Sequence, residues 1–218
     1  MQVEMWSDVI CPWCYIGKRR FEAAFAQFPQ RAELRVTWRS FELDPDAPRQ
    51  YPGTLDEMLA RKYGVSRQQA AAMNARVTTL AKEVGLEYRL ADARPGNTFD
   101  AHRLIHLAAV RGLGECAAER LMHAYFCEAL PVGEHAALAR LAPEFGISEA
   151  EALAALQGDG CSDAVRADES RAAQFGISGV PFFVFDGKYA VSGAQPVAVF
   201  TETLQQMWTE MRSVSEHK

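Results

Sequence analysis

The feature that most constrains this chain is a pair of cysteines two residues apart, placed directly after its first apolar run. The run extends from Val3 to Ile10, and Cys11-Pro12-Trp13-Cys14 follows it. Two thiols at this spacing can close a disulfide and reopen it. When such a pair opens a helix after a strand, the arrangement is typical of a thiol–disulfide redox site. The motif therefore predicts a strand, a turn at Cys11 and a helix.

The chemistry of the pair explains its position. Pro12 marks the first helical residue, because its fixed φ suits that position and its missing N–H costs nothing there. Cys11 then caps the helix, where free backbone N–H groups and the helix dipole favour the thiolate, the nucleophile of disulfide exchange. Cys14 lies one turn further in. We expect it to be buried, to keep a more ordinary pKa, and to resolve the mixed disulfide by attacking Cys11.

Two other interpretations of the pair are a zinc half-site and two structural thiols. A zinc site with four ligands needs a second ligand pair at similar spacing, and the sequence contains no other CxxC. The other three cysteines, Cys116, Cys127 and Cys161, are scattered, and no histidine pair accompanies them. The sequence therefore favours redox chemistry and predicts no metal.

Composition excludes several classes of function. The chain has 218 residues, of which 49% are hydrophobic, enough for one large domain or a small domain with an insertion. A net charge of −5 and the lack of a basic stripe argue against nucleic-acid binding. No apolar run approaches the ~20 residues of a membrane span. The first residues lack the features of a signal peptide, which predicts a cytoplasmic protein, although a trimmed mature chain would look the same.

Periodicity predicts strand, helix and strand over 3–7, 12–28 and 34–38. The middle of the chain shows only helical patterns with three capping boxes, Thr54/Glu57, Ser66/Gln69 and Ser148/Glu151. Two strands joined by Asp186-Gly187 and a last helix close the chain. The helices expected in the middle span 55–63, 66–84, 98–112, 115–129, 134–143 and 149–157; the last three elements span 182–185, 189–192 and 196–212. This pattern predicts an α/β thioredoxin fold with a large helical insertion, with 1–45 and 176–218 as the thioredoxin-like domain and 46–175 as the insertion.

The sequence resembles the DsbA-type thiol–disulfide oxidoreductases, and within them the cytoplasmic FrnE-like branch of predicted dithiol–disulfide isomerases. The resemblance covers essentially the whole chain. Its motifs are residues 8–18 (DVICPWCYIGK), 97–102 (NTFDAH), 178–183 (SGVPFF) and 192–196 (SGAQP). Kappa-class glutathione transferases and 2-hydroxychromene-2-carboxylate isomerases share the fold, but they carry serine where this chain has Cys11. This difference favours an oxidoreductase.

The resemblance implies a substrate-binding role for Pro12, Trp13, Val180 and Pro181. It implies that the Val180–Pro181 bond is cis and lies against the redox pair, whereas the sequence alone permits an ordinary turn before a strand. An extended substrate could then pair with the Val180 backbone. Trp13 should be exposed at the start of the helix. There it could receive an apolar substrate or simply pack against the insertion.

Three hypotheses for the function follow. The first is a thiol–disulfide oxidoreductase or isomerase acting on protein or small-thiol substrates, with no cofactor and with an external thiol system that recycles the pair. The second is a glutathione-dependent transferase or isomerase of the kappa type, and the third a non-catalytic redox sensor or holdase. The sequence does not determine the client, the direction of electron flow or the oligomeric state.

The remaining cysteines and two histidines have simpler interpretations. His102 and His106 share a helical face, but no further ligand set accompanies them, so packed histidines are favoured over a metal site, with His102 near the active site by resemblance only. Cys116 and Cys127 would lie about 16 Å apart on one helix, beyond the ~7 Å limit for a disulfide. We expect both to be small buried hydrophobic residues. Cys161 at a helix start could be mildly reactive. We expect residues 87–90 and 213–218 to be solvated segments.

Overall fold

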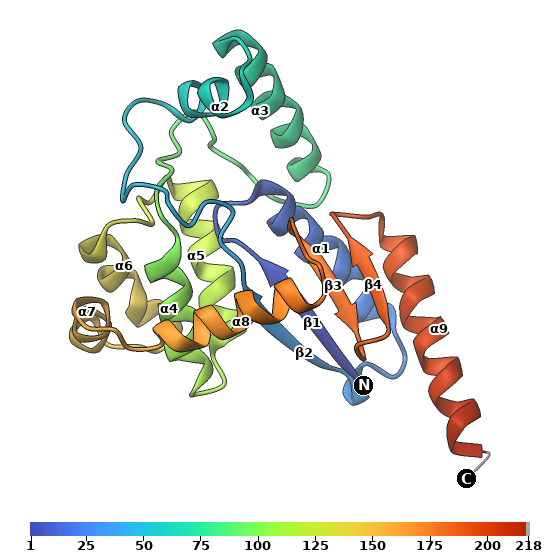
Figure 1. The fold of residues 1–218 in the computed structure, drawn as a ribbon. Coiled ribbons are helices and arrows are strands. Elements are labelled where there is room, and N and C mark those ends of the chain that lie inside the picture. The colour runs from blue at the N-terminus through green and yellow to red at the C-terminus, as the bar shows by residue number, and fades with distance from the viewer. Residues whose placement is uncertain (217–218) are drawn as a thin grey trace.

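A four-stranded mixed sheet forms the centre of the molecule (Figure 1). The computed structural model describes the backbone of residues 1–216 and the side chains of residues 1–212, so most of the expected solvated segment 213–218 lies outside the described residues. The strand order is β2-β1-β3-β4. β1 (Gln2–Ser7) and β2 (Arg35–Ser40) are parallel, while β3 (Phe182–Phe185) and β4 (Tyr189–Ser192) continue the sheet in antiparallel pairs.

The two faces of the sheet are covered by different helices because side chains alternate along β1. Val3 and Met5 pack with α1 (Pro12–Gln27) and α9 (Val197–Glu216). Trp6 points to the opposite face, where it packs with Ala172 of α8 (Ser162–Gln174). The order βαβ, then ββα, with helices on both faces, is the thioredoxin fold that the sequence predicts.

The β3–β4 turn follows the Asp-Gly signal. Asp186 has φ 47° and Gly187 φ 67°, the left-handed conformations that a tight hairpin turn of this kind requires. The Asp186 carboxylate also accepts a hydrogen bond from the Gln2 backbone N–H at 2.6 Å, which ties the turn to the start of β1.

The helical insertion lies to one side of the sheet and above it (Figure 1). α2 and α3 form a hairpin above the N-terminal end of α1, while α4 to α7 pack beside the sheet. Its apolar core is continuous with Cys11, Cys14 and Tyr15 of the redox motif. The helices are α2 (Leu55–Tyr63), α3 (Arg67–Lys82), α4 (Phe99–Ala109), α5 (Gly114–Glu128), α6 (His135–Leu141) and α7 (Glu149–Gln157), with 3-10 turns at Arg31–Glu33 and Ala142–Phe145.

Local signals set most of these boundaries. Thr54 and Ser66 form complete capping boxes with Glu57 and Gln69. The third expected box is only half formed: Ser148 accepts the Glu151 N–H, but the Glu151 carboxylate bonds to Arg111 instead of returning to the cap. A tertiary ion pair therefore replaces the local bond there.

Cys161 is expected at a helix start and does cap α8, but periodicity predicts no helix over 162–174. This segment is polar, and only Val165, Asp168 and Ala172 are buried, so it lacks a strong apolar stripe. The sheet supplies the missing stabilisation, because Asp168 accepts bonds from Arg39 and from the Ser40 backbone N–H at the end of β2. The division into 1–45 plus 176–218 and 46–175 stays a prediction, although α8 packs on the sheet. Among the described residues, no helix is both long and apolar enough to cross a membrane.

Candidate redox-active site

Cys11 stands at the N-cap of α1, directly beyond the end of β1. Its φ and ψ are −84° and 112°, the extended conformation of a cap residue, and Pro12 is the first helical residue. The Cys11 side chain makes no capping bond to the backbone, while its carbonyl accepts the Cys14 N–H at 3.0 Å. The sulfur is thus placed at the positive end of the helix dipole as the sequence predicts.

Cys14 is fully buried one turn into the helix, and both cysteines are free thiols in this structure. Burial, together with a hydrogen bond to the Cys11 sulfur, raises the pKa of Cys14 well above its ordinary value. The expectation of a more ordinary pKa for Cys14 is therefore wrong, because water does not reach the sulfur to solvate a thiolate. The consequence is an asymmetric pair in which Cys14 keeps its proton.

The Val180–Pro181 segment lies against this pair, and its peptide bond is cis. The Cys11 thiol donates to the Val180 carbonyl with a sulfur–oxygen distance of 3.7 Å. Pro181 packs on α1 at Gly17, where an added Cβ would lie 2.9 Å from the proline ring. Gly17 is therefore what allows this close approach.

Asp8 fixes the turn that carries Cys11. Its carbonyl accepts the Cys11 N–H at 3.1 Å, and its carboxylate accepts the Leu43 N–H at 2.8 Å. The other carboxylate oxygen lies 3.4 Å from Nε2 of His102, which is fully buried. His102 is thus close to the redox motif, as the resemblance implies. His106 instead contacts Ser40 and Asp168, so the two histidines do not share a ligand.

Tyr88 is part of the site, although the sequence predicts that residues 87–90 are solvated. The expectation is wrong for Tyr88 and Leu90, which are 6% and 4% exposed. The Tyr88 ring stacks on Phe126 at 4.4 Å, and its hydroxyl donates to the Pro12 carbonyl at 2.8 Å. The sequence does not indicate that Tyr88 is buried, because its neighbours Glu87 and Arg89 are charged and the irregular segment shows no periodicity.

A charged cluster fastens α1 to the insertion. Glu119 of α5 contacts Lys18 at 2.8 Å, accepts the Tyr15 hydroxyl at 2.5 Å, and pairs with Arg19. Lys18 also pairs with Glu22. Burial acts to raise the pKa of Glu119, but the Lys18 and Arg19 charges and the Tyr15 hydroxyl hold it below its ordinary value. No local pattern indicates this cluster, since Lys18 and Glu119 lie about a hundred residues apart.

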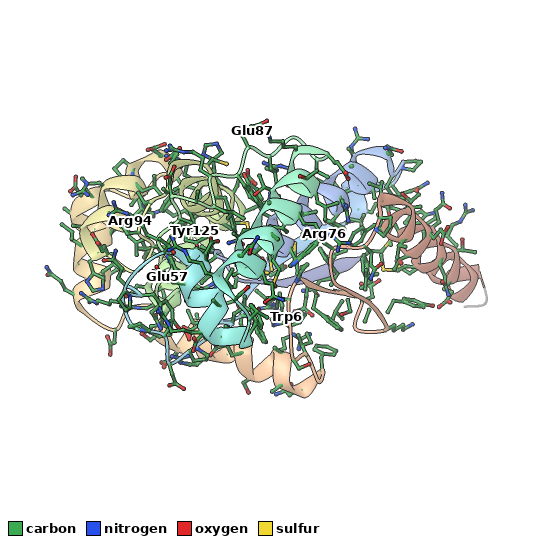
Figure 2. All side chains as sticks on the ribbon, turned by 90° about the horizontal axis from the view of Figure 1, so that it is seen from above. Trp6, Glu57, Arg76, Glu87, Arg94 and Tyr125 are labelled. Atoms are coloured by element: carbon green, nitrogen blue, oxygen red, sulfur yellow. The ribbon has the colours of Figure 1, made fainter. Side chains whose placement is uncertain are left out.

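A cavity of about 550 Å³ opens between the redox motif and the insertion. Cys11, Pro12, Trp13 and Val180 line one side. Trp13 is 43% exposed, so the packing alternative accounts for only part of its surface. Figure 2 looks down onto the side that carries α2 and α3 and labels Arg76 and Tyr125, which line the same cavity. The opposite wall consists of Leu55, Met58, Leu59, Lys62 and Tyr63 of α2 and Met73, Asn74, Arg76 and Val77 of α3.

A comparison with known protein families agrees with the thioredoxin fold and the cysteine pair at the start of α1. A model of the DSBA-like thioredoxin domain matches residues 2–205. The chain belongs to this family. Membership also establishes the fold class, a DSBA-like thioredoxin fold with a helical insertion, and places the chain among oxidoreductase-type proteins.

Individual proteins resemble this DSBA-like chain over nearly its whole length. A probable DsbA oxidoreductase from Streptomyces coelicolor is 46% identical, with a TM-score of 0.92 over 96% of this chain and 91% of that one. The uncharacterized protein YwbO of Bacillus subtilis is 26% identical over 206 residues, 94% of this chain and 96% of that protein. A 2-hydroxychromene-2-carboxylate isomerase has a TM-score of 0.72 over 98% of this chain and 99% of its own, but at 12% identity it shows only the shared fold.

The other three thiols of the DSBA-like chain lie on α5 or at the start of α8, outside the redox motif. Cys116 and Cys127 are both on α5, as expected, but Cys116 is exposed and not a buried hydrophobe. Cys161 caps α8 with a φ of 64°, and burial raises its pKa, which does not support a reactive thiol.

Removing the Tyr88 hydroxyl tests its bond to the redox helix. We expect Tyr88→Phe to lower the free energy of unfolding by about 1 kcal/mol, because a buried hydrogen bond is lost while the ring stack is kept. Urea unfolding measures the change. Tyr63→Phe is the matched control: Tyr63 is 56% exposed, and its variant should stay within about 0.5 kcal/mol of the parent. Equal effects of the two variants would contradict the assignment.

Glu119 should make stability depend on acid pH. Since its pKa in the folded protein lies below the ordinary 4.5, its contribution is complete above pH 4.5 and is lost as the pH falls through the folded value. We expect Glu119→Gln to cost about 1–3 kcal/mol at pH 7, because buried Lys18 loses a partner. The difference from the parent should shrink below pH 4.5, as urea midpoints across pH can show.

A surface carboxylate on the same helix provides the control for this experiment. Glu128 pairs with Arg120 and His123 and is 41% exposed, so Glu128→Gln should cost less than about 1 kcal/mol. A Glu119→Gln penalty that persists unchanged at pH 3 would show that shape and not charge is responsible.

Proposed function

We propose that the protein is a thiol–disulfide oxidoreductase that uses Cys11 and Cys14 as its redox pair. The observation that carries the proposal is the asymmetry of the two thiols: Cys11 caps α1 and lines the cavity although it is only 3% exposed, whereas Cys14 is fully buried and does not line the cavity. A nucleophile needs access to its substrate, and a resolving thiol needs only access to the nucleophile. Family membership and the name of the Streptomyces relative support the same chemistry.

The reaction proceeds by two exchanges. The Cys11 thiolate attacks one sulfur of the substrate disulfide, so the substrate S–S bond breaks, a mixed disulfide forms, and one substrate thiol leaves with a proton from solvent. Cys14 then attacks Cys11 and its proton passes to the departing substrate sulfur, so the Cys11–substrate bond breaks, the second thiol is released and a Cys11–Cys14 disulfide remains. Two electrons pass from the protein to the substrate, and an external thiol system must return them. The opposite sequence oxidises a substrate dithiol.

The cis Val180–Pro181 segment and the Pro12-Trp13 dipeptide are the proposed substrate-binding elements. The Val180 carbonyl already accepts a bond from Cys11, so a substrate chain laid against this backbone would place its sulfur beside the nucleophile. Protein disulfides and small disulfides are both substrates in this proposal. A cytoplasmic location and membership of the FrnE-like branch stay predictions.

The reduction potential of the pair tests the proposal and gives its direction. The protein is equilibrated in glutathione or dithiothreitol buffers, and its free thiols are counted by alkylation and mass spectrometry. We expect a two-electron transition confined to Cys11 and Cys14. A value near about −270 mV would assign a reductase and one near about −120 mV an oxidant. Failure of the pair to oxidise reversibly would overturn the proposal.

The scattered thiols should not take part. We expect the combined substitution Cys116→Ala, Cys127→Ala, Cys161→Ser to keep most insulin reductase activity, because Cys116 and Cys127 lie too far apart on α5 to bridge. Some stability should be lost where half-buried atoms are removed. Peptide mapping of the oxidised protein is the check. A stoichiometric disulfide with one of these thiols, and loss of turnover in the variant, would assign a second redox relay.

A glutathione-dependent isomerase or transferase is the second candidate. The cavity beside Cys11 favours it, because its walls are largely apolar and could accept an aromatic substrate. In such an enzyme Cys14 would not be needed for turnover. Activity on an aromatic substrate with glutathione, retained in Cys14→Ser, would therefore favour this candidate over an oxidoreductase.

A further inference from the structure

The α2 helix presents an apolar face that the protein leaves uncovered. Leu55 is its one buried residue among those described, whereas Met58 and Leu59 are half-buried and Tyr63 is 56% exposed. Their spacing puts them on one side of the helix, and that side lines the cavity above Cys11. On α3, Met73 is 47% exposed and lines the same cavity. Exposed apolar side chains gathered around a hollow indicate a ligand surface.

Two cations lie on the same walls. Lys62 lies one turn after Met58 and Leu59 on α2, and Arg76 of α3 lines the cavity as well (Figure 2). Both are exposed, and in the described part of the chain neither has an ion pair or a side-chain hydrogen bond. Their neighbours on the same helices differ, because Arg61 donates to the Pro52 carbonyl and Arg67 pairs with Glu57.

The acidic groups of the cavity are already engaged. Asp8 is buried and accepts the Leu43 N–H. Asp44 accepts the Tyr51 hydroxyl at 2.5 Å. The four charged side chains that line the cavity therefore sum to zero, but neither carboxylate pairs with Lys62 or Arg76, so both cations are available to an anionic ligand.

We propose that the substrate of this cavity is a small disulfide with an apolar body and at least one carboxylate. The sulfur lies at Cys11, the body lies along Trp13 and the α2–α3 wall, and the carboxylate reaches Lys62 or Arg76. The inference rests on the proposed function, since Cys11 performs the exchange and the protein dithiol supplies both electrons. A cavity of about 550 Å³ is within the usual range for small molecules and too small for a folded client.

Single-turnover reduction by the pre-reduced protein tests the inference. The two probes are 5,5′-dithiobis(2-nitrobenzoate), which is aromatic and carries two carboxylates, and 4,4′-dithiodipyridine, which is aromatic and neutral at pH 7.5. Each rate is divided by the rate of the same probe with dithiothreitol, which removes intrinsic reactivity. The ratio of the two normalised rates is the selectivity for the anionic probe.

Reversing the two charges should lower this selectivity. We expect a drop of about tenfold or more in Lys62→Glu/Arg76→Glu and an intermediate drop in Lys62→Gln/Arg76→Gln. The selectivity of the parent should also fall as salt is raised from 20 to 500 mM, probe concentrations being equal. Lys188→Glu is the matched control: Lys188 lies in the β3–β4 turn, at the opposite end of the sheet from α2 and α3 (Figure 1), and should keep the parent selectivity.

The outcomes separate this inference from the proposed function. If both probes are reduced through Cys11 but the double variants keep the parent selectivity, the inference is overturned while the oxidoreductase stands. The same holds if charge selectivity appears only with disulfide-linked acidic peptides, because the cavity would then serve a protein segment. If neither probe oxidises the protein, both the inference and the proposed function fail.

Discussion

Substituting Cys11 with serine is expected to abolish the reduction of insulin disulfides, to below roughly a thousandth of the parent rate. A hydroxyl at the N-cap can neither form a stable thiolate nor make an S–S bond to the substrate. Cys14→Ser should also lose turnover but by a different route: Cys11 still attacks, and mixed disulfides with clients accumulate because the resolving thiol is absent. Non-reducing electrophoresis after incubation with oxidised substrate distinguishes the two variants.

An exposed cysteine of the same chain provides the control for the Cys11→Ser and Cys14→Ser variants. Cys116→Ser changes an exposed thiol on α5 and should leave turnover at the parent level. Circular dichroism should show that Cys11→Ser is folded, since serine is close in size to cysteine and its hydroxyl can replace the long hydrogen bond of the Cys11 thiol to the Val180 carbonyl. Parent-like turnover in Cys11→Ser would remove the proposed mechanism.

The largest loss of stability is expected from Phe183→Ala. This ring is fully buried on β3, next to the cis bond, and packs on Phe200 of α9 at 4.8 Å and on Phe21 of α1 at 5.5 Å. Removing it leaves a cavity between the sheet and both helices. We expect a loss of about 3–5 kcal/mol in the free energy of unfolding, measured by urea denaturation.

Phe175→Ala is the matched control for that substitution. Phe175 is 37% exposed at the end of α8, where it meets the edge of Trp6 at 5.7 Å. Its removal should cost about 0.5–1.5 kcal/mol, because water already reaches part of the ring. Equal losses in the two variants would show that the sheet–α9 layer is not the stabilising core.

Local chemistry accounts for what the sequence by itself determined. The Cys-Pro-Trp-Cys motif predicts the cap and the start of α1, because proline fixes φ at the first helical position. Strand alternation, Asp186-Gly187 and the capping boxes at Thr54 and Ser66 predict elements whose boundaries depend on residues a few positions apart. The resemblance then placed Val180–Pro181 beside the redox pair.

Contacts between distant segments decided the rest. Periodicity does not reveal α8, because its sequence carries no strong apolar stripe and it packs on the sheet through Asp168, which bonds to the end of β2. Tyr88 is buried because its ring stacks on Phe126 and its hydroxyl donates to the Pro12 carbonyl, and both partners belong to segments far away in the chain. The pKa of Cys14 rises because the insertion and the sheet exclude water from its sulfur. Burial and long-range pairing depend on the packed chain as a whole, so no local pattern could reveal them.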